Sequence, residues 1–268
     1  MKADLHIHTT VSDGRMDPAE AVRLAGERGL EAIALTDHDT DAGYTMLAQL
    51  EPVRVAVLPG VEMDTRLDGA AVEILVYGHR PGEGPLAGLL AEVAGRRRRR
   101  AEIMWPALRR GLGVELPPVE SLFPPPRRVL TRPQIAESLV DSRLLPDFGA
   151  ALEVVAAYDP GFDPPGAEEA IRAARASGGR CVLAHPLQIE GMGLEALLRR
   201  LAGWGLEGVE VDYPYADPAH RRGTAGVRRL AREIGLFETG GSDAHRPEEI
   251  GRVTVELPEP LRGLVPGK

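Results

Sequence analysis

The chain of 268 residues has a single cysteine, Cys181, no asparagine and only two lysines, Lys2 and Lys268. One cysteine excludes an internal disulfide framework and fits a reducing compartment, so we expect a cytoplasmic protein. The N-terminal segment lacks the apolar run of a secretory signal, and no segment approaches the ~18 apolar residues of a membrane span. We therefore expect no membrane association. Few amides and 23 prolines suit a thermophile, while a GC-rich genome produces the same bias.

The charge balance is acidic, with 40 acidic against 32 basic residues and a net charge of −8. This balance is poor for coating nucleic acid, so we expect no stable complex with a nucleic-acid duplex. Hydrophobic residues make up 43% of the chain and charged residues 27%, which is typical of a globular protein. The length allows one or two domains with a large core.

Apolar runs alternate with helical patterns along most of the chain. Strands are expected at Ala3–Ile7, Ala32–Thr36, Val53–Leu58, Val72–Tyr77, Cys181–Ala184, Gly208–Val211 and Phe237–Thr239. Helices are expected at Asp17–Arg28, Leu194–Trp204 and Pro218–Ile234. This alternation predicts an α/β fold with a parallel sheet, either open or closed into a barrel.

Residues 96–166 interrupt the alternation with the run Arg96–Arg100 and the proline clusters Pro117–Pro118 and Pro124–Pro126. The prolines interrupt this segment too often for a large independent core. We therefore expect a helical insertion into one barrel domain formed by residues 1–95 and 167–268. The arginine run is typical of a solvated helix face, and attraction of phosphate is the alternative.

Six of the seven histidines follow the ends of predicted strands, and carboxylates join them there. These residues are His6, His8, His38, Glu62, His79, His185, Asp243 and His245. A lone histidine in such a place is more often a structural group, but barrel folds build their active sites on the rim formed by the strand carboxyl ends. Imidazole and carboxylate groups bind zinc, manganese and iron, so the pattern predicts a metal cluster. The seventh, His220, lies inside a predicted helix and is expected at the surface.

Five motifs in chain order resemble the PHP (polymerase and histidinol phosphatase) family of metal-dependent phosphoesterases. They are Asp4-Leu5-His6-Ile7-His8, Thr36-Asp37-His38, Pro59-Gly60-Val61-Glu62, Ala184-His185-Pro186 and Gly241-Ser242-Asp243-Ala244-His245. Ser12-Asp13-Gly14 and Thr131-Arg132-Pro133 are similar to the branch that hydrolyses nucleoside 3′,5′-bisphosphates and small 5′-phosphorylated RNA fragments. The resemblance implies a distorted (β/α)7 TIM-like barrel whose helical insertion caps the substrate.

The resemblance also implies three adjacent positions for two or three divalent ions. The first would be held by His6, His8, Glu62 and Asp243, the second by Asp13, His38 and His245, and the third by Glu62, His79 and His185. Asp13 stands where the histidinol-phosphatase-like members carry histidine. A carboxylate is a harder ligand than imidazole, which favours manganese or iron over zinc.

The implied reaction is hydrolysis of a phosphate ester on a small nucleotide substrate by a metal-bridging hydroxide. Candidate substrates are nucleoside 3′,5′-bisphosphates, nucleoside monophosphates and short 5′-phosphorylated oligoribonucleotides. Arg132 would hold a phosphate through its guanidinium fork, with Thr131 beside it, although a surface arginine at a helix start is the alternative. The catalytic residues would be His6, His8, Asp13, His38, Glu62, Asp243 and His245.

Two other functions stay open at this point. A histidinol-phosphate phosphatase would keep the metal cluster, but Asp13 and the insertion argue against it. A non-catalytic, metal-stabilised PHP module would resemble the degenerate copies fused to some polymerases, but the ligand set here is complete.

Overall fold

The computed structural model describes residues 1–47 and 54–265, so Val53, the first residue of an expected strand, lies outside the described residues. In the described part, eight strands form one sheet. They are β1 (Lys2–Ile7), β2 (Ala32–Leu35), β3 (Ala56–Leu67), β4 (Ala70–Tyr77), β5 (Arg180–Leu183), β6 (Gly208–Asp212), β7 (Phe237–Gly240) and β8 (Val255–Glu256). Each expected strand overlaps one of β1 to β7, but β3 continues well beyond the expected end at Leu58.

The sheet order is β7-β6-β5-β4-β3-β2-β1-β8, and its strands do not all run in one direction. β4 is antiparallel to both β3 and β5, and β8 is antiparallel to β1, whereas the other neighbours are parallel. The prediction of a parallel sheet is therefore wrong for β4. Asp68 and Gly69 explain the difference, because they form a two-residue turn with positive φ angles of 50° and 88°. Such a turn joins antiparallel strands only.

The segment after β7 returns to β1 and nearly closes the sheet into a barrel. The Ala244 backbone N–H donates to the His6 carbonyl (3.2 Å), and the His8 N–H donates to the Ala244 carbonyl (2.9 Å). The buried Asp4 carboxylate accepts from the backbone N–H groups of Ser242 and Gly251, each at 2.8 Å. Burial raises the pKa of Asp4 to about 6 despite these hydrogen bonds. Gly241 is required at this seam because a Cβ atom there would collide with the backbone of His6.

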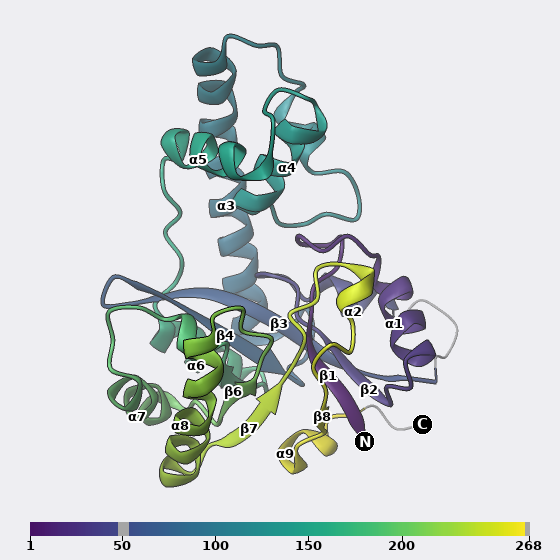
Figure 1. Ribbon diagram of the computed structural model, residues 1–268, viewed down its shortest axis with the longest axis vertical. Helices are drawn as coiled ribbons and strands as arrows, with labels where there is room; N and C mark the ends of the chain where they lie inside the picture. The colour runs from purple at the N-terminus through teal and green to yellow at the C-terminus, as the bar shows by residue number, and fades with distance from the viewer. Residues whose placement is uncertain (48–53, 266–268) are drawn as a thin grey trace.

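Helices surround the barrel and rise above it (Figure 1). They are α1 (Pro18–Glu27), α2 (Ala42–Leu47), α3 (Gly84–Leu112), α4 (Arg132–Asp141), α5 (Phe148–Tyr158), α6 (Ala167–Ala176), α7 (Leu194–Trp204), α8 (Pro218–Ile234) and α9 (Glu259–Arg262), with short 3₁₀ turns at Val119–Leu122, Pro186–Gln188 and Pro247–Glu249. Helices α6, α7 and α8 pack with strands β3 to β6 in the largest hydrophobic cluster. Within the described residues, no helix is both long and apolar enough to cross a membrane.

Helix α3 belongs to both parts of the molecule. Its first half packs on the barrel through Leu86 and Val93, and its second half packs in a separate cluster through Met104 and Leu108. Figure 1 shows α4 and α5 beside the upper half of α3. Residues 96–166, which we call the cap, thus have a small hydrophobic cluster of their own above the barrel.

The arginine run in α3 is not a uniformly solvated face, contrary to the prediction. Arg97 and Arg100 are only 3% and 6% exposed. They lie three residues apart on one side of the helix, where each meets buried or half-buried carboxylates. Arg100 donates to both oxygens of Asp159 at 2.8 and 2.6 Å, which ties α3 to the end of α5. Burial of an arginine is tolerated only when such a partner accompanies it.

We expect Arg100→Met to lower the free energy of unfolding by about 3 kcal/mol, because the Asp159 carboxylate would stay buried without its cation. Urea unfolding followed by circular dichroism measures the change. Arg99→Met, at the exposed neighbouring position, serves as the control and should change stability by less than about 0.5 kcal/mol. Equal stability of the two variants would contradict this account of Arg100.

Candidate metal centre

Histidines and carboxylates gather at the rim where the parallel strands end. His6 lies in β1 and His8 just beyond it, while His38, His185 and Asp243 lie in the segments that follow β2, β5 and β7. Glu62 comes from the long β3, whose extension brings it beside His38 in a bridge between the two backbones. Within the described residues, these side chains and their neighbours form four overlapping groups that could hold a metal ion. Three of them contain ligands implied for the three metal positions, and the fourth consists of His38, Asp64 and Glu73.

The first group consists of His6, His8, Glu62 and Asp243. The Nε2 atoms of the two histidines face each other at 3.2 Å. Each also faces Glu62 Oε2, at 3.2 and 3.1 Å, and Asp243 Oδ1, at 3.4 and 3.1 Å. The four atoms therefore surround one point, and this is the arrangement implied for the first metal position.

The spacing of these four atoms fits a divalent cation. Ligands at about 2.0–2.1 Å from an ion lie about 3.4 Å apart in a tetrahedron and about 3.0 Å apart along an octahedral edge. The observed separations of 3.1 to 3.4 Å lie within this range. A proton on one imidazole could not bond to three acceptors at once, whereas a central cation would contact every one of them.

The second group consists of Asp13, His38, His245 and His8. Asp13 Oδ1 lies 3.4 Å from His245 Nε2 and 3.6 Å from His8 Nδ1, and its Oδ2 lies 3.7 Å from His38 Nε2. The structure thus brings together the residues implied for the second position. His8 joins this group through its second ring nitrogen, so it lies between the first two groups.

The third group consists of Glu62, Glu73 and His185, and it omits His79. His185 Nε2 lies 3.1 Å from Glu62 Oε1 and 3.1 Å from Glu73 Oε2. The structure does not bring His79 to this group. Instead, His79 Nε2 lies 3.2 Å from Asp41 Oδ2 in a half-buried pair. Because β4 is antiparallel, the residue after its carboxyl end lies at the opposite rim, while Glu73 in its first half faces the site.

Charges in the cluster stabilise one another. Burial opposes ionisation of Glu62, but His6, His38 and His185 outweigh burial and keep its pKa well below the usual range. Burial likewise opposes a charge on His6, but Glu62, Glu210 and Asp243 raise its pKa well above the usual value. For His245, the neighbouring Asp13 and Asp243 outweigh burial and raise the pKa to about 9. Glu62 is therefore ionised at neutral pH, and positively charged groups around it balance its charge.

Two residues that support the cluster, Glu210 and Tyr213, were not predicted from the sequence. The fully buried Glu210 carboxylate accepts from His6 Nδ1 at 3.0 Å and from the His185 backbone N–H at 2.9 Å. The Tyr213 hydroxyl donates to Asp243 Oδ2 at 2.8 Å. A charged residue inside the apolar strand Gly208–Val211 was the available signal for Glu210, because buried carboxylates need partners.

Asp64 and Glu73 were also not predicted from the sequence. Asp64 lies two residues after Glu62, so both side chains lie on the same face of β3. Glu73 is the direct cross-strand partner of Asp64. The register of the hairpin was needed to find Glu73, and the sequence alone did not reveal that β3 and β4 form a hairpin.

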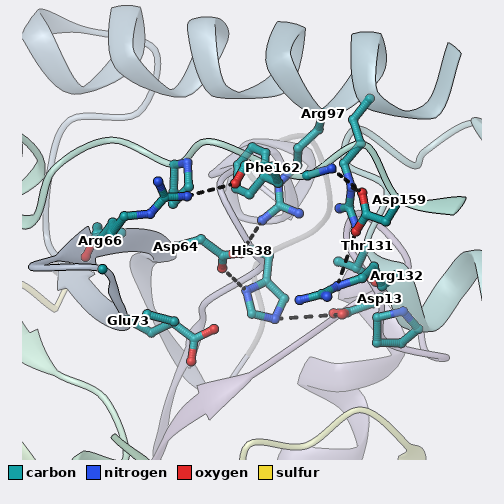
Figure 2. Close-up of a pocket in the computed structure, with 17 residues that line it drawn as sticks. Asp13, His38, Asp64, Arg66, Glu73, Arg97, Thr131, Arg132, Asp159 and Phe162 are labelled. Carbon is teal, nitrogen blue, oxygen red and sulfur yellow. Dashed lines mark hydrogen bonds and ion pairs between the residues drawn. The ribbon is translucent and has the colours of Figure 1, made fainter. Parts of the chain in front are cut away.

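A cavity of about 470 Å³ lies between the cluster and the cap. Figure 2 shows Asp13, His38, Asp64 and Glu73 on one side of it and Arg97, Asp159 and Phe162 on the other. The Arg132 side chain extends into the cavity and is 59% exposed, with Asp159 Oδ2 at 3.8 Å from its Nε. Within the described residues, Arg132 therefore has a weaker ion pair than Arg97 or Arg100 and keeps donors available.

Thr131 and Gln134 build the start of α4. The Thr131 hydroxyl accepts from the Gln134 N–H (3.4 Å), and the Gln134 side chain accepts from the Thr131 N–H (2.9 Å), which forms a capping box. Gln134 also donates to the Ser12 carbonyl, next to Asp13. Both side chains are buried and make structural contacts, so they position Arg132 and join the cap to the Asp13 loop.

Comparisons with known proteins agree with this site. A family model described as PHP domain matches residues 4–104, and one described as PHP-associated matches residues 225–264. The phosphoribosyl 1,2-cyclic phosphate 1,2-diphosphodiesterase of Eggerthella lenta is 30% identical over 94% of this chain and 97% of its own. The 3′,5′-nucleoside bisphosphate phosphatase of Chromobacterium violaceum is 30% identical over 93% of this chain and 89% of its own.

A solved structure from Bifidobacterium adolescentis, assigned as a metal-dependent phosphoesterase, superposes with a TM-score of 0.81. The two sequences are 27% identical, and the superposition covers 91% of this chain and 87% of the Bifidobacterium chain. These comparisons confirm the predicted family and the predicted fold class. The chain belongs to the PHP family.

Proposed function

We propose that this protein is a metal-dependent phosphoesterase that releases phosphate from a small nucleotide. The observation that carries the proposal is the Glu62-centred cluster of imidazoles and carboxylates, which faces a cavity lined by the exposed Arg132. The relatives named above act, by their names, on a nucleoside bisphosphate and a phosphoribosyl cyclic phosphate. Those substrates fit the nucleotide hypothesis and not the histidinol phosphate alternative.

We further propose that two or three divalent ions are bound, with manganese or iron preferred because carboxylates contribute from every group. His6, His8, Glu62 and Asp243 would hold the first, Asp13, His38 and His245 the second, and Glu62, Glu73 and His185 the third. Divalent cations bound there would neutralise phosphate charge and lower the pKa of water, which are the main requirements of this hydrolysis.

The protein residues prepare this site before substrate arrives. Glu210 accepts from His6 Nδ1, so the lone pair of Nε2 is directed to the centre of the first group. Tyr213 holds Asp243 in the same way through its hydroxyl. His185 and Asp243 have positive φ angles of 22° and 48°, a strained backbone that is common where side chains are aimed at a reacting centre.

Arg132 is proposed to hold a phosphate oxygen pair of the substrate from the cap side. Its guanidinium has a planar fork that matches phosphate, and its fractional exposure leaves the fork accessible. Residues 96–166 would then act as a substrate cap on the barrel formed by residues 1–95 and 167–268. The cytoplasmic location expected from the lone Cys181 stays a prediction.

The proposal predicts phosphate release from nucleoside 3′,5′-bisphosphates, nucleoside monophosphates or 5′-phosphorylated oligoribonucleotides when manganese is present. A colorimetric phosphate assay across these substrates, with histidinol phosphate and a phosphoribosyl cyclic phosphate alongside, identifies the preferred class. Chelation should abolish turnover and added manganese should restore it, because the cluster would lose its cations. Faster release from histidinol phosphate, or full activity after chelation, would contradict the proposal.

Arg132→Ala should lower kcat/KM on the preferred nucleotide by about 10–100-fold, the loss expected for hydrogen bonds to a charged group. Arg132→Lys keeps the charge but loses the fork, so it should still impair the enzyme clearly. Arg128→Ala, at an exposed cap position, is the matched control and should match the wild type. Unchanged steady-state kinetics of Arg132→Ala would assign Arg132 to the surface alternative.

A further inference from the structure

Arg97 is the one arginine of the run Arg96–Arg100 that connects the cap helix to the metal cluster. Its Nε donates to Asp39 Oδ2 at 2.7 Å, and its Nη2 donates to Asp64 Oδ2 at 2.6 Å. The Phe162 ring lies 4.3 Å from its guanidinium carbon and covers one face of the group. An arginine this buried is fixed in one position, so its partners are fixed with it.

The network continues from Asp64 to His38. Asp64 Oδ1 lies 3.1 Å from His38 Nδ1, and the Asp64 backbone N–H donates to Asp39 Oδ1 at 3.1 Å. Asp39 therefore holds the backbone of Asp64 while Arg97 holds its side chain. Figure 2 shows the chain of contacts from Arg97 through Asp64 to His38.

His38 has two ring nitrogens with different surroundings. Nδ1 faces Asp64 at 3.1 Å and Glu62 Oε2 at 3.4 Å, while Nε2 faces Asp13 Oδ2 at 3.7 Å. A neutral imidazole can bind a cation only through the nitrogen that carries no proton. A carboxylate this close to Nδ1 favours the proton on that nitrogen, which would leave the lone pair of Nε2 for a cation near Asp13.

We propose that Arg97 is a positioning residue that acts through Asp64 to hold His38 ready for the cation of the second group. The inference rests on the proposed function, because it requires that His38 and Asp13 bind a divalent ion. It gives the buried arginine a role in metal binding as well as in stability, and it makes the cap helix α3 part of the support of the metal centre.

The test measures Mn²⁺ binding by electron paramagnetic resonance of the free ion, in the full-length chain. Arg97→Met should weaken Mn²⁺ binding at one site by about 10–100-fold, the effect typical of losing the partner of a ligand histidine. Asp64→Asn should do the same. The double variant should bind Mn²⁺ no more weakly than whichever single variant has the lower affinity, because both substitutions interrupt the same chain of contacts to His38.

Arg100→Met is the matched control, because Arg100 is a buried arginine of the same helix whose partner, Asp159, does not contact a histidine of the cluster. It should lose stability yet keep wild-type Mn²⁺ affinity. If Arg97→Met is unfolded by circular dichroism, Arg97→Lys replaces it and should show a smaller loss of affinity in the same assay.

Two failures are distinguishable. Wild-type protein that binds no Mn²⁺ would overturn the proposed function. If the wild type binds Mn²⁺ and Arg97→Met binds it with unchanged affinity, only the role of Arg97 would be overturned. The same conclusion would follow if the losses of Mn²⁺ affinity in the two single variants multiplied in the double variant.

Discussion

The buried carboxylate of Glu62 is the constraint on which the rest of the site depends. Its Oε2 atom faces His6, His8 and His38, and its Oε1 atom faces His185, all within 3.1 to 3.4 Å. A carboxylate that is 1% exposed requires compensating positive charge. The barrel supplies it with side chains from separate strand ends, and a divalent cation would satisfy the same requirement more completely than protons do.

The arginines of the cap follow the converse requirement, that a buried positive charge needs a carboxylate beside it. Arg97 and Arg100 are each neutralised by buried or half-buried carboxylates, whereas Arg132 meets Asp159 only at 3.8 Å. The cap is held to the barrel by the ion pairs of Arg97, by Gln134 at the Asp13 loop and by the long helix α3. One arginine is left with donors that an anionic substrate could use. On the proposed function, the arginine that binds substrate is therefore a different one from those that stabilise the cap.

The sequence alone predicted the parts of the site that depend on local pattern. Apolar runs located β1 to β7, and the histidines and carboxylates after them were expected on one rim, where the structure places all but His79. The misplacement of His79 has a single physical cause, the reversed direction of β4, which Asp68 and Gly69 determine. Glu73 and Arg97 were missed because their roles arise from cross-strand register and helix packing, which composition and spacing do not encode.

The central claim, that Glu62 is shared by bound divalent cations, is tested most directly by anomalous diffraction from crystals grown with manganese. The account predicts a peak within coordination distance of His6, His8, Glu62 and Asp243, with any further peaks at the groups that contain Asp13 or Glu73. It predicts none beside His79. A map without a peak at Glu62, or with manganese bound to His79, would contradict it.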